Sequence, residues 1–341
     1  MNSIFQACGR LCLFCVSLFF VLTPLSAAPT GEIIFVHPVS MSEIWISNAE
    51  GTTARKLFRQ TYGSIDKIEV QEEGNYVLVV ADKAIFEGNN VRIFSGYELF
   101  LLDRQHPGRK AKNLTLGRFT DFVDADISKD GDVAFIRRPG IRLIRNEELA
   151  KPEPKIELLF NAMEWNSNLF EIEWSPDGKQ IAFTTHNGLY LLDVATKDVF
   201  RITEMDVCNP VFSPDRKQIA FSTVVARNGK LWTKAITVVP VQPDAEPEIV
   251  HVKKDYVYGV DSWSPDGKFI AYSSYTHKEL VNIELFRSVG NFIIPATGGE
   301  PEPILLTMKY TVHSLDWDDR TYPVEPSDSL VTTWGKLKAQ K

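Results

Sequence analysis

Four acidic side chains recur at equivalent places in a repeated pattern of this chain. Each one directly precedes the apolar residue that ends a strand-like segment. The four are Glu69, Asp126, Glu173 and Asp316. Carboxylate oxygens that converge on one point can hold a hard cation such as Ca²⁺. The other interpretation is a solvated polar lining without an ion. We prefer it, because alternate side chains of a strand can also point elsewhere, and we therefore expect no metal.

The pattern that contains these residues is a hairpin signature. Its clearest copy is W-S-P-D-G-K-Q-I-A-F at 174–183, with close copies at 212–221 and 263–272. Proline presets φ at the second turn position, and a left-handed glycine lets a short hairpin continue with the correct twist. We expect the turn aspartates to bond the local backbone and the aromatic residue before each serine to lie in the core. The turn aspartates are Asp130, Asp177, Asp215 and Asp266.

The spacing of the copies predicts the architecture. Anchor residues at 70, 127, 174, 212, 263 and 317 recur about every 40 to 60 residues, and the segments between them are rich in strands, as in propeller blades. The chain begins with three strands at 31–58 that lack a first strand, and 312–317 supplies one without successors. The prediction is an all-β fold: a six-bladed β-propeller of four-stranded antiparallel blades over 29–320. A composite blade combining N- and C-terminal strands closes it.

The two ends of the chain have their own signatures. Arg10, an apolar run at 11–22 and small residues at 26–28 predict a signal peptide over 1–28, hence a periplasmic or secreted protein. The run is too short for a stable membrane span, although an uncleaved anchor is the alternative. The tail at 321–341 has helical apolar spacing and predicts a short docked helix, or else a frayed tail. Cys208 is the only cysteine beyond the signal, so no internal disulfide is expected.

The hairpin signature resembles the WD40-like (PD40) repeat of TolB-type bacterial proteins. The match is specific at 174–183 and 263–272, good at 212–221, and with weaker copies covers most of 31–320. The resemblance implies a six-bladed propeller in the bacterial periplasm or outside the cell, usually a binding platform rather than a catalyst. The α/β domain that TolB places before its propeller is not expected here, so TolB's own role is not implied.

These observations predict a non-enzymatic propeller that binds an unidentified protein or polymer as a monomer. The nucleophile elbow G-x-S-x-G, H-E-x-x-H and the P-loop are absent. The net charge of −7 argues against a nucleic-acid partner. Insertions at 86–93 and 277–290 are the candidate binding loops, and His186, His277 and His313 are candidate contacts on a loop face.

Two other functions stay open at this point. One is a hydrolase or lyase that uses a metal or carboxylates at the channel mouth, and its support is the acidic ring alone. The other is a glycan-binding propeller, with Trp165 and Trp232 as aromatic anchors.

Overall fold

The computed structural model describes residues 31–318 with internal gaps. The gaps are 49–50, 60–62, 73, 88–90, 107–108, 119–121, 166–167, 229–230, 277–288 and 306–311. The predicted signal peptide at 1–28 and the tail at 321–341 both lie outside the described residues. The described part of the chain contains no helix long and apolar enough to cross a membrane.

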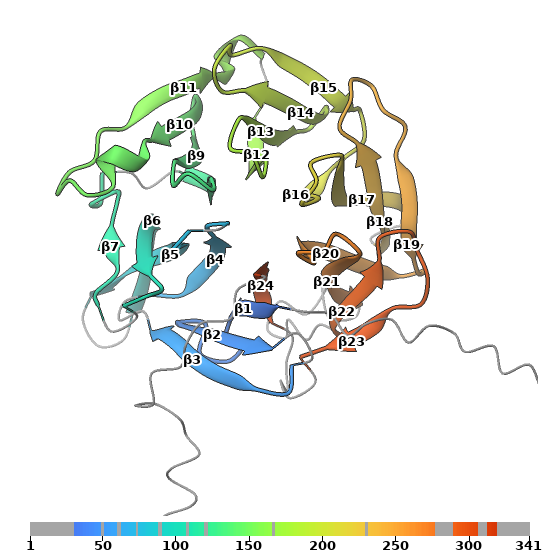
Figure 1. Ribbon diagram of the computed structural model, residues 1–341, viewed down its shortest axis with the longest axis horizontal. Helices are drawn as coiled ribbons and strands as arrows, with labels where there is room; N and C mark the ends of the chain where they lie inside the picture. The colour runs from blue at the N-terminus through green and yellow to red at the C-terminus, as the bar shows by residue number, and fades with distance from the viewer. Residues whose placement is uncertain are drawn as a thin grey trace, which may run out of the picture.

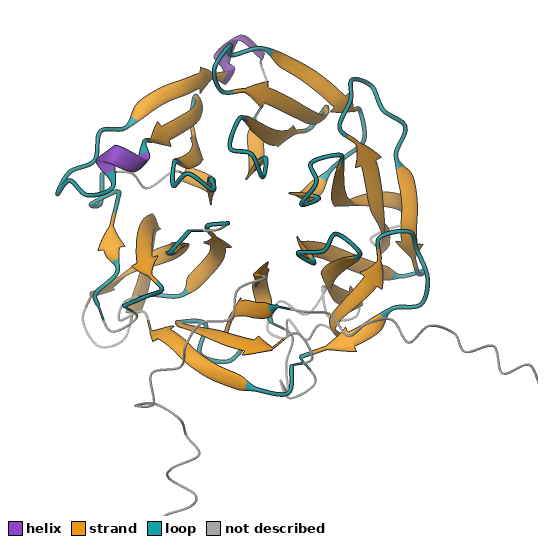
Figure 2. Ribbon diagram, in the orientation of Figure 1, coloured by secondary structure: helices purple, strands orange, loops and turns teal. Residues whose placement is uncertain are grey.

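The described residues form six four-stranded antiparallel sheets, the blades, which are arranged around a central opening (Figures 1 and 2). Blade 1 orders β24 (His313–Asp318), β1 (Glu32–Val36), β2 (Glu43–Asn48) and β3 (Ala54–Arg59). Blade 2 comprises β4 (Ile65–Val70), β5 (Tyr76–Glu87), β6 (Val91–Asp103) and β7 (Lys112–Asn113). Blade 3 comprises β8 (Phe122–Ile127), β9 (Val133–Arg137), β10 (Gly140–Ile144) and β11 (Glu157–Asn161).

The remaining three blades follow in chain order. Blade 4 comprises β12 (Leu169–Trp174), β13 (Gln180–Thr185), β14 (Gly188–Asp193) and β15 (Val199–Thr203). Blade 5 comprises β16 (Cys208–Phe212), β17 (Gln218–Asn228), β18 (Leu231–Pro240) and β19 (Glu248–Val252). Blade 6 comprises β20 (Tyr256–Trp263), β21 (Phe269–Thr276), β22 (Gly290–Pro295) and β23 (Glu302–Ile304). Two 3-10 turns, η1 (Asn146–Glu148) and η2 (Ala162–Trp165), complete the elements described.

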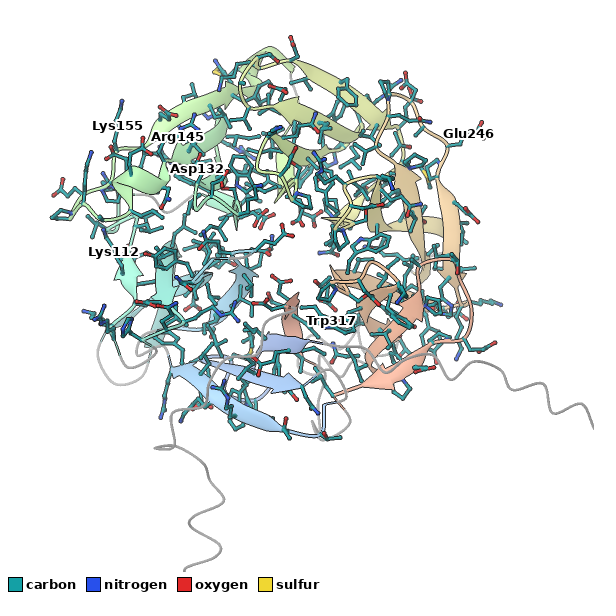
Figure 3. The ribbon with its side chains drawn as sticks, viewed as in Figure 1. Lys112, Asp132, Arg145, Lys155, Glu246 and Trp317 are labelled. Carbon is teal, nitrogen blue, oxygen red and sulfur yellow. The ribbon has the colours of Figure 1, made fainter. Side chains whose placement is uncertain are left out.

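The composite blade is confirmed. The C-terminal strand β24 pairs antiparallel with β1, with Glu32 opposite Asp318 and Ile33 opposite Trp317. Trp317, labelled beside the central opening in Figure 3, is 6% exposed. Both ends of the described chain therefore enter one sheet, and the ring has no open first or last blade.

The hairpin turns behave as the sequence predicts. Ser175 Oγ donates to Asp177 Oδ1 at 2.8 Å, and the same carboxylate oxygen accepts the backbone N–H of Lys179 at 3.2 Å. The same contacts recur in the copies at 213–217 and 264–268. Gly178 takes a left-handed φ of 71°, and Arg216 holds the equivalent position at 63°. The turn aspartates of these three copies are thus structural.

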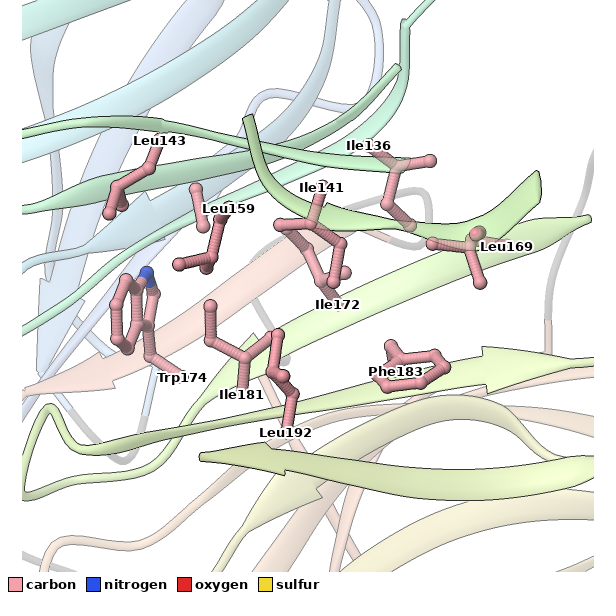
Figure 4. Close-up of a cluster of buried hydrophobic side chains, with 12 residues drawn as sticks. Ile136, Ile141, Leu143, Leu159, Leu169, Ile172, Trp174, Ile181, Phe183 and Leu192 are labelled. Atoms are coloured by element: carbon pink, nitrogen blue, oxygen red, sulfur yellow. The ribbon is translucent and has the colours of Figure 1, made fainter. Parts of the chain in front are cut away.

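Hydrophobic residues fill the spaces between neighbouring blades. Between blades 3 and 4, Ile136, Ile141 and Leu143 pack against Trp174 and Phe183 (Figure 4). The aromatic residues at the ends of the first strands of four blades are buried, as predicted. Trp174, Phe212, Trp263 and Trp317 are 4–6% exposed, and each packs in the cluster shared with an adjacent blade. The inner strands are therefore held at a fixed distance from the axis.

The insertion predicted at 86–93 is mostly strand. The β5–β6 hairpin continues beyond a register shift between Asp82 and Ala84 and pairs as far as Glu87 opposite Val91. Blade 5 has a similar extension, in which β17 and β18 pair as far as Asn228 opposite Leu231. In the second insertion, 277–288 lies outside the described residues. The side chains of Trp165 and Trp232, named above as glycan anchors, are outside them as well.

Candidate functional site in the central channel

The innermost strands bring the predicted carboxylates to the axis of the ring. Carboxylate oxygens of Glu69, Asp126 and Glu173 lie within 4.8 Å of one another. Asp316 lines the same cavity, whose volume is about 530 Å³. Its lining runs from turn prolines such as Pro176 at one face to the starts of the first strands at the other. The cavity is therefore a channel through the propeller, and three of the four predicted carboxylates gather at one point in it.

A second tier of polar residues, which the sequence analysis missed, lines the channel two positions earlier on the same strands. It contains Lys67, Asp124 and Glu171, and blade 6 adds Asp261. Because side chains two apart on a strand share a face, the first three could have been found from the alternation alone. Lys67 is the central member, since its Nζ lies 2.6 Å from Glu69 Oε1 and 2.9 Å from Asp124 Oδ1.

Most channel carboxylates join one blade to the next. Asp124 Oδ2 accepts the backbone N–H of Ile172 at 2.9 Å, and Asp126 Oδ2 accepts that of Trp174. Glu171 Oε2 does the same for Asn209 at 2.7 Å.

Blade 1 is joined to its neighbours in the same way. Asp316 Oδ2 accepts the N–H of Val70 at 2.9 Å, and Asp316 Oδ1 accepts the Ser262 hydroxyl at 2.9 Å. Part of the acidic ring therefore joins neighbouring blades. Its carboxylates accept backbone N–H groups that would destabilise the fold if they were buried without a partner.

Glu173 differs from these residues. Its carboxylate makes no hydrogen bond or ion pair within the described part of the chain. The negative charges of Asp126 and Glu69 lie close to it and repel its own charge. It is consequently the channel carboxylate with the most freedom to interact with a bound species.

Burial and mutual repulsion change the protonation of the channel. Burial raises the pKa of Asp126, of Glu171 and of Asp261 to about 7 in each case. Burial also raises the pKa of Glu69 and Glu173 well above the usual range. At neutral pH the carboxyl groups of the channel therefore share protons and hold fewer negative charges than their number suggests.

Lys67 keeps its charge in this environment. Burial acts to lower the pKa of its ammonium group, but the carboxylates of Asp124 and Glu69 outweigh burial and hold that pKa well above the usual value. An ammonium group thus stands permanently among the channel carboxylates.

Of the three predicted histidines, His186 lies away from this cluster. His186 is exposed and packs edge-on against Phe170, with ring centroids 4.4 Å apart. It lines a separate depression of about 690 Å³ between blades 3 and 4, together with Arg138 and Met163. His277 and the side chain of His313 lie outside the described residues, so their predicted roles remain predictions.

No protein-family model matches the sequence. A dipeptidyl-peptidase 5 from Porphyromonas gingivalis is 25% identical over 184 residues. These residues are 48% of this chain and 26% of the peptidase, so the chain spans about a quarter of the length of that curated relative.

Solved structures resemble the propeller more completely. TolB from Acinetobacter baumannii has a TM-score of 0.56 and 17% identity, over 84% of this chain and 66% of that one. A putative TolB from Agrobacterium tumefaciens has a TM-score of 0.53 and 18% identity, over 87% and 99% of the two chains. A structure of a nidogen/laminin complex gives a TM-score of 0.57 at 8% identity, over 85% and 99%. The chain therefore has a TolB-like six-bladed propeller fold.

Proposed function

We propose that this protein is an exported, non-enzymatic propeller that binds a protein or polymer partner across one face. The observation that carries the proposal is the pair of extended hairpins β5–β6 and β17–β18. Both connect the second and third strands of a blade, so they project from the same face, opposite the S-P-D-G turns. Blades 2 and 5 lie across the ring from one another (Figure 1). The hairpins therefore flank one mouth of the channel.

The channel mouth between these hairpins is acidic and polar. Asp66, Asp261 and Tyr275 line it together with Lys67 and Asn209, in a hollow of about 440 Å³. A partner held between the hairpins would meet these groups. Binding surfaces on a rigid scaffold are usually built in this way, from segments that extend beyond the common framework.

A carboxylate-dependent hydrolase or lyase is the second candidate function. One observation in its favour is Glu173, whose carboxylate has no hydrogen-bond or ion-pair partner in the described region. The other is the pKa of about 7 for Asp126, a value suited to proton transfer. The similarity to a dipeptidyl-peptidase supports enzyme activity only weakly, because it covers about a quarter of that protein. Inter-blade bonding by Asp126 favours the structural role instead.

Shortening the hairpins tests the binding proposal. Residues 84–95 or 226–232 are replaced by Asn-Gly, which closes a two-residue hairpin. We expect each variant to keep the unfolding midpoint of the parent within a few degrees and to lose at least about tenfold in affinity for partners captured from an envelope fraction. Captured partners are identified by mass spectrometry, and their dissociation constants are then measured with purified components.

A matched control alters the opposite face. Lys179, Lys217 and Lys268 are 68–80% exposed beside the turns there, and all three are changed to Glu. This variant should bind like the parent. Equal binding by both shortened variants, with binding lost in the lysine variant, would place the partner on the other face and refute the proposal. If the parent protein hydrolyses a substrate and the Glu173→Gln variant does not, the result would favour the hydrolase function instead.

A further inference from the structure

The three gathered carboxylates leave space for one cation. Their oxygens lie within 4.8 Å of one another, a separation that matches two Ca²⁺–oxygen distances of about 2.4 Å. The chain itself brings a positive group beside them. Lys67 lies on β4 two residues before Glu69, so both side chains extend from one face of the strand toward the axis.

We propose that the Lys67 ammonium is the built-in cation of this channel: it lies beside the group formed by Glu69, Asp126 and Glu173, and its charge takes the place of the divalent ion that these carboxylates would otherwise bind. Its Nζ contacts Glu69 Oε1 at 2.6 Å and Asp124 Oδ1 at 2.9 Å. The charges of Asp126 and Glu173 act on the same ammonium. The parent protein therefore needs no metal there, and the ammonium repels any that enters.

The position of Lys67 in the repeat supports this assignment. The equivalent inner positions hold Asp124 in blade 3, Glu171 in blade 4, Asn209 in blade 5 and Ser314 in blade 1. Blade 2 alone of these places a cationic residue in the channel lining. A lysine offers three donors on a flexible stem, which suits several oxygens that face one point. The same oxygens without the ammonium would be a hard-cation site.

Removing the ammonium should therefore create a metal site. The full protein and its Lys67→Met variant are heated in 5 mM CaCl₂ and in NaCl of equal ionic strength. For the variant we expect calcium to raise Tm by about 5 °C, because a ligand that binds only the folded state stabilises it. For the parent we expect a shift below about 1 °C.

Three further variants make the comparison specific. Lys67→Arg keeps a positive charge and should show no calcium response. Lys67→Met combined with Glu173→Gln loses one of the three carboxylates and should lose most of the gain. Lys129→Met removes a lysine that lines the same channel nearer the S-P-D-G face, and it should behave like the parent.

Two results would overturn the proposal. One is a stoichiometric divalent ion in the dialysed parent protein that disappears on Glu173→Gln. The other is a Lys67→Met variant without any calcium response. If the Lys67→Met variant folds in the calcium buffer and not in the NaCl buffer, that result supports the proposal, because its folding then depends on calcium. If that variant folds in neither buffer, Lys67→Gln takes its place, and the same two readings apply to it.

Discussion

A chain that ends at residue 311, and so lacks β24, should fail to form the closed propeller. The deletion removes Val312, Leu315 and Trp317, which are 0–6% exposed and pack against blades 1 and 6. Losing one buried tryptophan or leucine costs about 2–5 kcal/mol, so the sum approaches the entire stability of a typical domain. Circular dichroism and size-exclusion chromatography should show an unfolded or aggregated chain, since the bare edge of β1 invites pairing with other chains.

The matched control is a chain that ends at Asp318. It keeps β24 and drops the residues that follow, and we expect it to unfold cooperatively near the midpoint of the full protein. A synthetic peptide spanning 310–320, added during refolding of the shorter chain, should restore part of the native signal. Cooperative unfolding of the 311 truncation at the parental midpoint would show that the ring closes without β24.

The second large effect is on stability as a function of pH. An Asp or Glu in the unfolded chain titrates near pH 4. Asp126, Glu171 and Asp261 titrate at about 7 in the folded protein, so the folded state binds protons more tightly between those values. The free energy of unfolding should therefore fall as pH rises from 5 to 8, by about 2–3 kcal/mol for each of the three groups that titrates independently. Urea unfolding at a series of pH values measures this.

Other groups modify the trend. Burial also raises the pKa of Glu69 and Glu173, and these two act in the same direction. Burial lowers the pKa of His37 and His251, so these two stabilise the folded state as pH rises through about 6.5 and partly offset the trend. Asp215 has its pKa lowered to about 2 by bonds to Lys217, and it acts only in acid.

Glu171→Gln is the specific control for the pH trend. The glutamine oxygen can still accept the N–H of Asn209, while one carboxyl that titrates near 7 is lost. The fall in the free energy of unfolding between pH 5 and 8 should become smaller by about 2–3 kcal/mol. A parental stability that rises steadily from pH 5 to 8 would contradict the assignment of raised pKa values to the channel.

The repeat allowed the ring to be predicted well. The S-P-D-G turn fixes the end of the first strand, so Trp174 and Trp263 could be placed between blades from sequence alone, and the partial copy at 317–320 placed Trp317 in the same way. The missing first strand at the N-terminus and the surplus strand at 312–317 predicted the closure that pairing of Ile33 with Trp317 confirms. The 86–93 segment was harder, because strand pairing of a long hairpin depends on its partner more than on local composition.

The site was predicted less completely. Convergence of Glu69, Asp126 and Glu173 followed from their equivalent positions in the repeat. The role of Lys67 did not, because the sequence shows a lysine in a polar strand without showing that its ammonium reaches Asp124 of the next blade. The bonds from Asp124 and Asp126 to the next blade were equally hidden, since they depend on the stagger between strands of different blades.

The pairing of β1 with β24 also has a mechanical consequence. Residue 32 lies opposite residue 318, so the first residue of β1 and the last residue of β24 lie side by side on adjacent antiparallel strands. A force that pulls these two residues apart loads the ladder one hydrogen bond at a time and unzips it rather than shearing it. A molecule stretched from both ends in optical tweezers should therefore open first at blade 1, at a lower force than one stretched between two residues on β13 and β17. The strand pair that closes the ring is thus also the contact that yields first when the two ends of the chain are pulled apart.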